Sequence, residues 1–270
     1  MIVREIECKS VLSETGLPAD YAINCYVGCG HACRYCYARY MKRFTGHREA
    51  WGTFVDVRVN APEVLEREVR RKPAGAVMLS SVCDGWQPLE ARYGVSSRCV
   101  EILARQGWHV RILTKGGLVG RVLPTLEGKP ADIGVTVTAW DERLREAIEP
   151  GASPTRERLE MLGEAAERGI AVWAFLGPFL PMLTDTEENL DALFAAVARL
   201  PVTHLHTDRV NFRSGVAASL KQMAAEHFPE LVGEYRWLGR DTDEDEAYAD
   251  QLEARIARAA ERHGLSGKLR

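Results

Sequence analysis

Three cysteines fall within one short stretch, GCGHACRYC, at the spacing C-x3-C-x2-C: Cys29, Cys33 and Cys36. A structural zinc site is usually closed by four protein ligands that come as two close pairs, and this stretch supplies only three thiols. Thiolates also bind iron–sulfur clusters. A four-iron cube held by three cysteines keeps one iron free for an outside ligand, much as catalytic zinc keeps one open position. The spacing therefore favours an open, reactive metal centre.

The other cysteines and histidines leave two alternatives open. A closed zinc site would need a fourth ligand, and a second metal cluster would need four more thiols. The candidate fourth ligands are Cys8, Cys25, His31 and His47. The thiols for a second cluster would be Cys8, Cys25, Cys83 and Cys99, which are scattered along the chain.

Composition limits the classes of protein to which this chain can belong. It has 270 residues, 46% hydrophobic and 27% charged, with a net charge of −3, as is ordinary for a soluble globular protein. There is no apolar run of membrane-spanning length. Seven cysteines without a secretory signal predict a reducing, cytoplasmic location, where clustered cysteines bind metal more often than they form disulfides.

Because the chain is acidic overall, nucleic-acid binding would need a local basic patch. The candidate residues for such a patch are Arg34, Arg39, Lys42, Arg43 and Arg48.

Strands and helices alternate along most of the chain. Apolar or alternating runs predict strands, and capping residues, Pro and Gly predict the ends of helices. The predicted strands are 53–60, 75–81, 109–115, 132–138, 169–177 and 202–208. The predicted helices are 60–71, 96–106, 118–126, 141–148, 154–168 and 185–200, with a further amphipathic helix near the carboxyl end.

This order predicts a parallel sheet with helices packed outside it. The strands between residues 75 and 208 are apolar on both faces, as buried parallel strands are. Five or six β/α units are fewer than the eight that close a full barrel. The fold expected is therefore an α/β open barrel.

Several blocks of the sequence resemble one family. The cysteine triplet with Tyr35 before its last member is similar to the signature of the radical S-adenosylmethionine enzymes, and its flanks, INCYVGCGHACRYCYAR, resemble the spore photoproduct lyase-like branch. Four further blocks match that branch in order. They are SSVCDGWQPLE (80–90), ILTKGGLVGR (112–121), VTVTAWDERLREAIEPGASPTRERLEML (135–162) and GIAVWAFLGPFLP (169–181).

The resemblance implies a fold, cofactors and partners. The fold is a partial (β/α)6 TIM-type barrel over residues 1–228, with the cysteine loop at residues 25–40 and a C-terminal helical extension at 229–270. The cofactors are a [4Fe–4S] cluster and S-adenosylmethionine, which chelates the open iron and is cleaved by one electron to methionine and a 5′-deoxyadenosyl radical. A flavodoxin or ferredoxin would supply the electron. We expect a cytoplasmic monomer that makes no contact with a membrane.

Several individual residues are candidates for cofactor binding, hydrogen transfer or substrate contact. The resemblance implies that Tyr35 lies by the adenine and that Lys115 and Thr136 bind the cofactor. Asp84 and Gln87 follow the second predicted barrel strand, where loops carry chemistry, and are further candidates for cofactor contacts. The resemblance suggests Cys83 as a hydrogen-atom donor, and Tyr37 is a candidate to relay hydrogen. The substrate candidates, expected where the final strand ends at the barrel mouth, are His204, His206, Asp208 and Asn211.

The substrate itself stays open. A thymine–thymine lesion in DNA is the first expectation from the family branch. A small molecule, a peptide or an RNA base are alternatives for the same radical chemistry. A zinc-stabilised binding module without catalysis is the alternative from another class.

Overall fold

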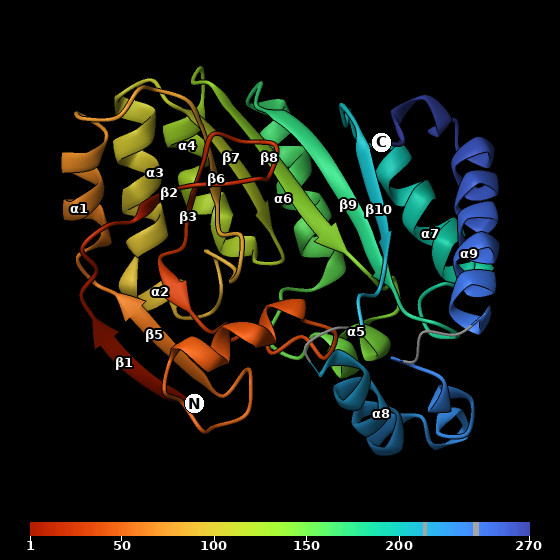
Figure 1. Cartoon of the computed structure of the whole chain (residues 1–270). Coiled ribbons are helices and arrows are strands. Elements are labelled where there is room, and N and C mark those ends of the chain that lie inside the picture. Colours follow the sequence, from red (N-terminus) through yellow and green to blue (C-terminus); the bar gives the residue numbers. More distant parts are fainter. Residues whose placement is uncertain (213–214, 240–242) are drawn as a thin grey trace.

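The computed structural model describes residues 1–212, 215–239 and 243–270. A seven-stranded sheet, open at both edges, forms its centre (Figure 1). The strand order is β10-β9-β8-β7-β6-β3-β2; neighbours from β10 to β3 are parallel, and β2 is antiparallel to β3. The bounds are β2 (Leu12–Glu14), β3 (Tyr21–Ile23), β6 (Ala76–Leu79), β7 (His109–Thr114), β8 (Ala131–Val137), β9 (Ala171–Phe179) and β10 (Leu205–Arg209). The expected partial (β/α)6 barrel is confirmed.

Helices cover one face of this sheet and leave the other face toward the barrel interior (Figure 1). They are α1 (Ala61–Glu68), α2 (Glu90–Tyr93), α3 (Val95–Arg105), α4 (Leu123–Leu126), α6 (Thr155–Glu167) and α7 (Glu187–Ala198). The short helices η2 (Gly117–Val122) and α5 (Glu142–Ile148) complete the connections.

The alternation of side chains along β8 explains the packing. Ile133 and Val135 are fully buried in the same apolar cluster as Leu162 of α6, so they face the helices. Since successive strand residues point to opposite faces, Gly134 faces the barrel interior, and a Cβ on it would lie 2.4 Å from the ring of Trp173 on β9. Glycine here lets the indole lie flat against the inner wall.

A second, small sheet lies beside the barrel at the end where the cysteine loop is found (Figure 1). Its order is β1 (Ile2–Ile6), β5 (Phe54–Arg58), β4 (Tyr26–Val27). The predicted strand 53–60 therefore forms, but it lies outside the barrel. The first barrel strand is instead β3, which the sequence analysis did not predict. Strand 202–208 was predicted to begin three residues too early.

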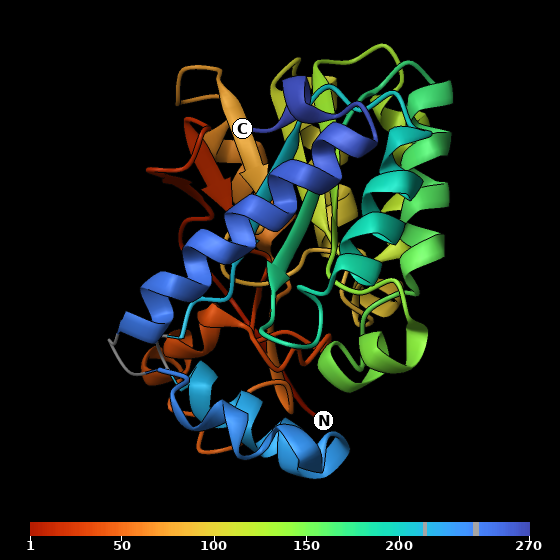
Figure 2. The same ribbon diagram turned by 90° about the vertical axis from the view of Figure 1, so that its right-hand side faces the viewer.

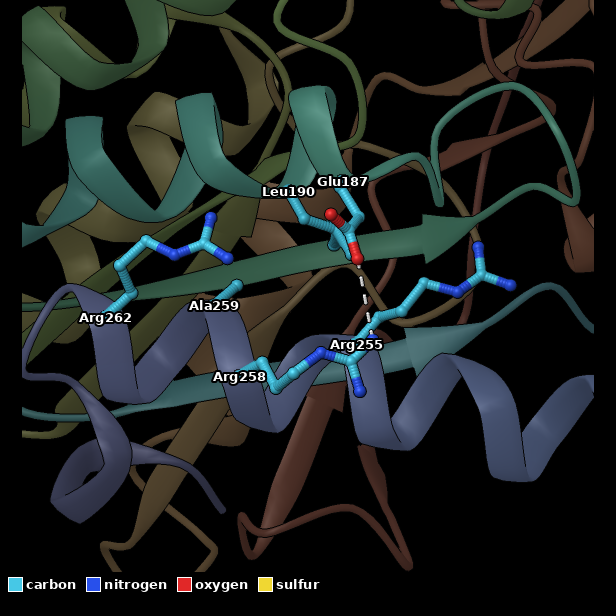
Figure 3. A pocket seen from close by; sticks show the side chains of 6 residues that line it. All are labelled: Glu187, Leu190, Arg255, Arg258, Ala259 and Arg262. Atoms are coloured by element: carbon cyan, nitrogen blue, oxygen red, sulfur yellow. Dashed lines mark ion pairs between the residues drawn. The ribbon is translucent and has the colours of Figure 1, made fainter.

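The carboxyl-terminal part packs along the opposite side. After α8 (Val216–His227) and the short turns η3 (Pro229–Leu231) and η4 (Glu234–Arg236), helix α9 (Asp243–Arg262) runs across α7 (Figure 2), and η5 (Ser266–Lys268) follows. Figure 3 shows Arg258 of α9 reaching Glu187 of α7, 3.6 Å away. The division into units at 1–228 and 229–270 stays a prediction, and residues 240–242 lie outside the described residues. No helix in the described ranges is long and apolar enough to cross a membrane.

Candidate metal and cofactor site

The cysteine loop (residues 25–40) runs across the carboxyl ends of the parallel strands and leads into η1 (Tyr37–Phe44) (Figure 1). This is the end at which barrel enzymes carry their active sites. Cys29 and Cys33 are buried, with 7% of each residue exposed, and Cys36 is part-buried. All three are free thiols. The loop therefore holds three unpaired sulfurs at the barrel mouth.

Side chains of the barrel rim fix the backbone of the cysteine loop. Gln87 accepts the N–H of Gly30 on its Oε1 at 2.7 Å, and its Nε2 donates to the carbonyl of Gly28 at 3.3 Å. The N–H of Gly151 donates to the carbonyl of His31 at 3.0 Å. A Cβ on Gly151 would lie 2.2 Å from the carbonyl oxygen of Gly30, so only glycine permits this approach. The loop is held at several points independently of any metal.

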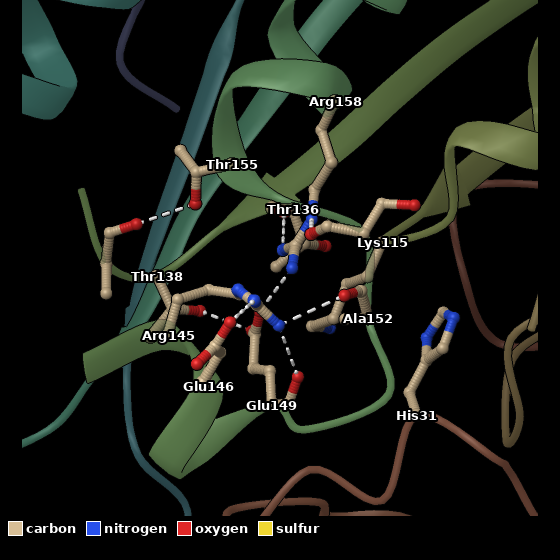
Figure 4. Close-up of polar contacts among 12 residues, drawn as sticks. His31, Lys115, Thr136, Thr138, Arg145, Glu146, Glu149, Ala152, Thr155 and Arg158 are labelled. Carbon is tan, nitrogen blue, oxygen red and sulfur yellow. Dashed lines mark hydrogen bonds and ion pairs between the residues drawn. The ribbon is translucent and has the colours of Figure 1, made fainter. Parts of the chain in front are cut away.

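A buried polar network, drawn in part in Figure 4, fastens Tyr35 to the barrel. Its hydroxyl donates to Glu149, which also accepts from Thr138 Oγ1 at 3.0 Å and from Arg158 at 2.6 Å. Glu149 and Arg158 are completely buried. Burial opposes the charge on Glu149, but Arg158, Lys115 and the Tyr35 hydroxyl hold the pKa of this carboxyl below its usual value. The network thus preserves a buried anion directly behind the cysteine loop.

Asp84 organises the strand ends on the other side of the mouth. One oxygen accepts the Thr114 hydroxyl at 2.6 Å, and the other accepts the backbone N–H of Lys115 at 2.8 Å and lies 3.4 Å from Nδ1 of His31. Although burial favours the neutral form, these partners hold the pKa of Asp84 well below its usual range. Both oxygens are thus already bound within the protein, as is the Gln87 amide, and a direct contact of either residue with the cofactor stays a prediction.

Lys115 places a positive charge beside the thiols. Its ammonium lies 5.7 Å from the centre of the Tyr35 ring. Burial disfavours its charge, but Cys33, Glu149 and Asp84 raise the pKa of Lys115 above its usual value. Thr136 follows Val135, the residue of β8 that is paired with Thr114, and is 3% exposed. A cation at this position suits a carboxylate ligand, in agreement with the role that the family resemblance implies.

Burial also determines the state of the thiols. It raises the pKa of Cys29 and Cys36, and that of Cys33 to about 12 despite the opposing charge of Lys115. Thiols with such pKa values do not ionise at neutral pH by themselves, whereas a coordinating metal deprotonates them outright. These cysteines are therefore poor free nucleophiles and suitable ligands.

The residues present fit an iron–sulfur cluster in their donor chemistry. The indole N–H of Trp51 is buried without a hydrogen-bond partner within the described chain, and Cys36 packs against the apolar cluster to which Trp51 belongs. N–H groups directed at sulfur are typical around such clusters. In the described residues no three His, Cys, Asp or Glu side chains surround one point as ligands of a single ion would. The thiolates of a cube bind separate irons and do not need that arrangement.

Cys83 lies in the segment that follows β6, and Tyr37 contacts the same segment. The Tyr37 hydroxyl donates to the carbonyl of Ser81 at 2.6 Å. Asn24 Oδ1 accepts from the backbone of Val82 at 3.0 Å and lies 3.6 Å from the Cys83 sulfur. Burial raises the pKa of Cys83 to about 12, so the thiol keeps its S–H bond at neutral pH.

The predicted substrate residues do not all lie at the mouth. His204 precedes β10, and its ring stacks on Trp173 with centroids 5.3 Å apart; His206 meets both rings edge-on. The Trp173 indole in turn donates to Asp132, near the start of β8. The two histidines therefore do not lie at the mouth, because one precedes β10 and the other is its second residue, while the strand ends at Arg209. Contact of either histidine with a substrate stays a prediction.

Two of the predicted substrate residues do lie where expected. Asp208 and Asn211 are at and beyond the carboxyl end of β10. Contact of either residue with a substrate stays a prediction.

Sequence reasoning missed two supports of the loop. Glu149 and Arg158 lie within the matched block 135–162, but their part in anchoring Tyr35 was not predicted, because their contact depends on the folding of α5 and α6 together. The segment that contains Trp51 carried no recognisable motif. Its run of His, Trp and Gly directly after the cysteine loop was the available signal.

Comparison with known proteins identifies the family. The model of the radical SAM superfamily matches residues 23–195. An uncharacterised protein of Mycobacterium bovis is 31% identical over 276 residues, which cover 97% of this chain and 81% of that protein.

Solved structures of spore photoproduct lyase share the fold. The lyase complexed with dinucleoside spore photoproduct superposes with a TM-score of 0.70 at 16% identity, over 98% of this chain and 80% of that one. A variant of the lyase with bound AdoMet and the same dinucleoside superposes with a TM-score of 0.70 at 16% identity, over 98% and 79%. With its three free thiols at the barrel mouth and these matches, the chain belongs to the radical S-adenosylmethionine superfamily.

Proposed function

We propose that this protein is a radical S-adenosylmethionine enzyme in which Cys29, Cys33 and Cys36 hold a [4Fe–4S] cluster. When bound, the cluster and S-adenosylmethionine together supply a 5′-deoxyadenosyl radical that abstracts a hydrogen atom from the substrate. The observation that carries the proposal is the set of three free thiols on one loop at the barrel mouth, next to the part-buried Lys115.

The chain's own residues would bind and orient the cofactor. Lys115 offers its ammonium to the methionine carboxylate, and Thr136 offers a hydroxyl from the next strand. Tyr35 is fixed through Glu149, so its ring and backbone form a preorganised wall for the adenine. Preorganisation of this kind lowers the entropic cost of binding. Asp84 acts mainly by fixing the backbone that carries Lys115.

Cys83 is our candidate for returning a hydrogen atom to the product radical. An S–H bond is weaker than most C–H bonds, and the raised pKa keeps Cys83 as the neutral thiol that such a transfer needs. Tyr37, whose hydroxyl is bound to the carbonyl of Ser81, is the candidate relay that would restore the thiol by passing on a hydrogen atom taken from 5′-deoxyadenosine, which would become the 5′-deoxyadenosyl radical again.

A nucleic-acid lesion of the photoproduct type is the first candidate substrate, supported by the structural likeness to spore photoproduct lyase bound to its dinucleoside. This makes lyase chemistry in DNA repair the leading hypothesis. A small molecule, a peptide or RNA would use the same radical step. A steep decrease in affinity with salt would support the nucleic-acid substrate, since phosphate contacts release counterions.

An acidic flavodoxin or ferredoxin is the proposed electron donor. Residues 21–48 contain five basic residues and no acidic one, although Arg34 is paired with Glu226 and Arg39 binds backbone carbonyls of the loop. Lys42, whose ammonium donates to the carbonyl of Arg48, and Arg43 lie on η1 near the half-exposed Tyr37 and the exposed Phe44. Complementary charge would speed the encounter with an acidic donor.

Anaerobic purification followed by turnover tests the proposal. We expect a brown protein with about four irons and sulfides per chain that forms 5′-deoxyadenosine with S-adenosylmethionine and dithionite. Deuterium transferred from a labelled candidate substrate into 5′-deoxyadenosine would identify the substrate. A colourless protein that contains zinc and no iron would overturn the proposal in favour of a binding module.

A further inference from the structure

The segment after η1 packs directly on the cysteine loop. Gly52 has φ +92°, and a Cβ on it would lie 2.6 Å from the Cβ of Ala32 and 2.9 Å from its Cα. The backbone at Gly52 therefore packs against Ala32 too closely to leave room for a side chain. Trp51, 8% exposed, belongs to one apolar cluster with Cys29 and Ala38, against which Cys36 packs. This segment forms a wall over two of the three ligand thiols.

Trp51 carries a donor without an acceptor. Its Nε1–H is buried and has no hydrogen-bond partner within the described residues. An unpaired buried N–H costs about 1–3 kcal/mol, and native structures rarely leave one without a reason. Cys36 packs against the apolar cluster to which Trp51 belongs, so its sulfur is the candidate acceptor for this buried N–H.

The indole is held in place from behind. Phe54 meets it edge-on, with ring centroids 5.8 Å apart, and the His47 ring stacks on Phe54 at 4.0 Å. His47 is fixed in turn, with Nε2 2.8 Å from Asp56 and Nδ1 3.0 Å from Glu49. A side chain braced in this way cannot turn its N–H to water without disturbing the whole stack.

We propose that Trp51 donates a hydrogen bond to the Cys36 sulfur when that thiolate binds the cluster, and that this bond raises the cluster's reduction potential. The inference rests on the proposed function, since it requires an iron–sulfur cluster at Cys36. Reduction adds negative charge to the cluster and its sulfurs, so a fixed N–H donor stabilises the reduced form more than the oxidised form. Trp51 is thus a positioning and tuning residue that makes the cluster easier to reduce.

Substitution of Trp51 by Phe tests the inference in the full-length, cluster-loaded protein. We expect the reduction equilibrium to shift about tenfold toward the oxidised cluster, about 59 mV for a one-electron couple. Redox titration followed by electron paramagnetic resonance measures this shift without S-adenosylmethionine or substrate. Trp108→Phe is the matched control, because Trp108 is also buried but packs on Tyr21, away from the cysteine loop.

A second substitution separates the hydrogen bond from packing. Replacing Trp51 with 3-benzothienylalanine keeps the shape of the indole and removes only the N–H donor. The inference predicts that it shifts the potential as Trp51→Phe does, while Trp108→Phe leaves it unchanged. A wild-type potential in the benzothienyl variant, with four irons bound, would refute the role of Trp51 and leave the proposed function standing. Wild-type protein that binds no cluster after anaerobic reconstitution would refute both.

Discussion

Gln87 connects the rim of the barrel to the middle of the cysteine loop, where its Oε1 accepts the backbone N–H of Gly30 at 2.7 Å. The side chain is completely buried. One amide group thus determines where the loop between the first two ligand cysteines lies. The same side chain also binds the carbonyls of Gly28 and Asp84, so it joins the cysteine loop to the segment that follows the second barrel strand.

Gln87→Ala should therefore loosen the loop. Leaving the Gly30 N–H buried without a partner costs about 1–3 kcal/mol of unfolding free energy, and we expect iron content after reconstitution to fall as well. Urea denaturation and iron analysis measure the two effects. Gln106→Ala is the control, since Gln106 is exposed at the end of α3 and should change neither quantity.

Glu149→Gln tests the buried ion pair. Arg158 would keep its charge without a partner, and we expect a loss of about 3–5 kcal/mol in unfolding free energy. The exposed neighbour Glu146 provides the control Glu146→Gln, which should cost well under 1 kcal/mol. Equal effects of the two substitutions would show that the network does not anchor the loop.

The same pair predicts how stability depends on pH. The pKa of Glu149 is lowered in the folded protein from its usual 4.5, so its stabilising contribution is complete above that value. It should be lost as pH falls below 4.5 through the folded pKa, because the folded state must then take up a proton that the unfolded state already holds. Unfolding free energies measured between pH 6 and 3, as rough limits, should fall less steeply in Glu149→Gln than in the wild-type protein.

Gly52→Ala tests the close approach of the two loops. Alanine is strained at φ +92°, and its Cβ would also collide with Ala32. Gly46 has φ +71° with nothing within 4 Å of a Cβ. Gly46→Ala should therefore lower the unfolding free energy only by the cost of backbone strain, about 1–2 kcal/mol. We expect Gly52→Ala to cost clearly more and to release iron faster under a chelator. If the two variants behave alike, the segment around Trp51 is not pressed against the cysteine loop.

Cys83→Ala tests hydrogen-atom return once a substrate is known. Without the S–H group, the product radical should be quenched by other donors, and we expect by-products together with at least a tenfold loss of normal product, about 1.4 kcal/mol in barrier. Chromatography with mass spectrometry measures the distribution of products. Cys8→Ala, at a part-buried thiol that follows β1, is the control. Unchanged yield and purity with Cys83→Ala would exclude the donor role.

The parts of the fold that could be predicted are those with local signals. The strands β6 to β9 are apolar runs between helical patterns, so their order alone indicates a parallel sheet. The metal site could also be predicted, because the spacing of Cys29, Cys33 and Cys36 is a local feature of the sequence. Strand β3 has only three residues and no flanking pattern, and its place in the barrel follows from pairing with β6, which lies far along the chain.

The contacts that shape the site depend on tertiary structure. The bond from Tyr35 to Glu149 spans 114 positions of sequence, and no local rule indicates it. His204 was grouped with residues at the strand's carboxyl end although it precedes the first residue of β10, so its side chain lies at the opposite end of the barrel from the one expected. The position of Trp51 over Cys36 requires the turn at Gly52 that only the folded chain reveals.

The last residues of the chain have a consequence for association. Strand β10 is one edge of the open sheet, and Leu269 forms a bridge to its first residue, Leu205, whose carbonyl accepts the N–H of Arg270 at 3.0 Å. Exposed strand edges invite pairing with other chains. The tail therefore caps the beginning of this edge, and removing its final two residues should make the protein more prone to aggregate.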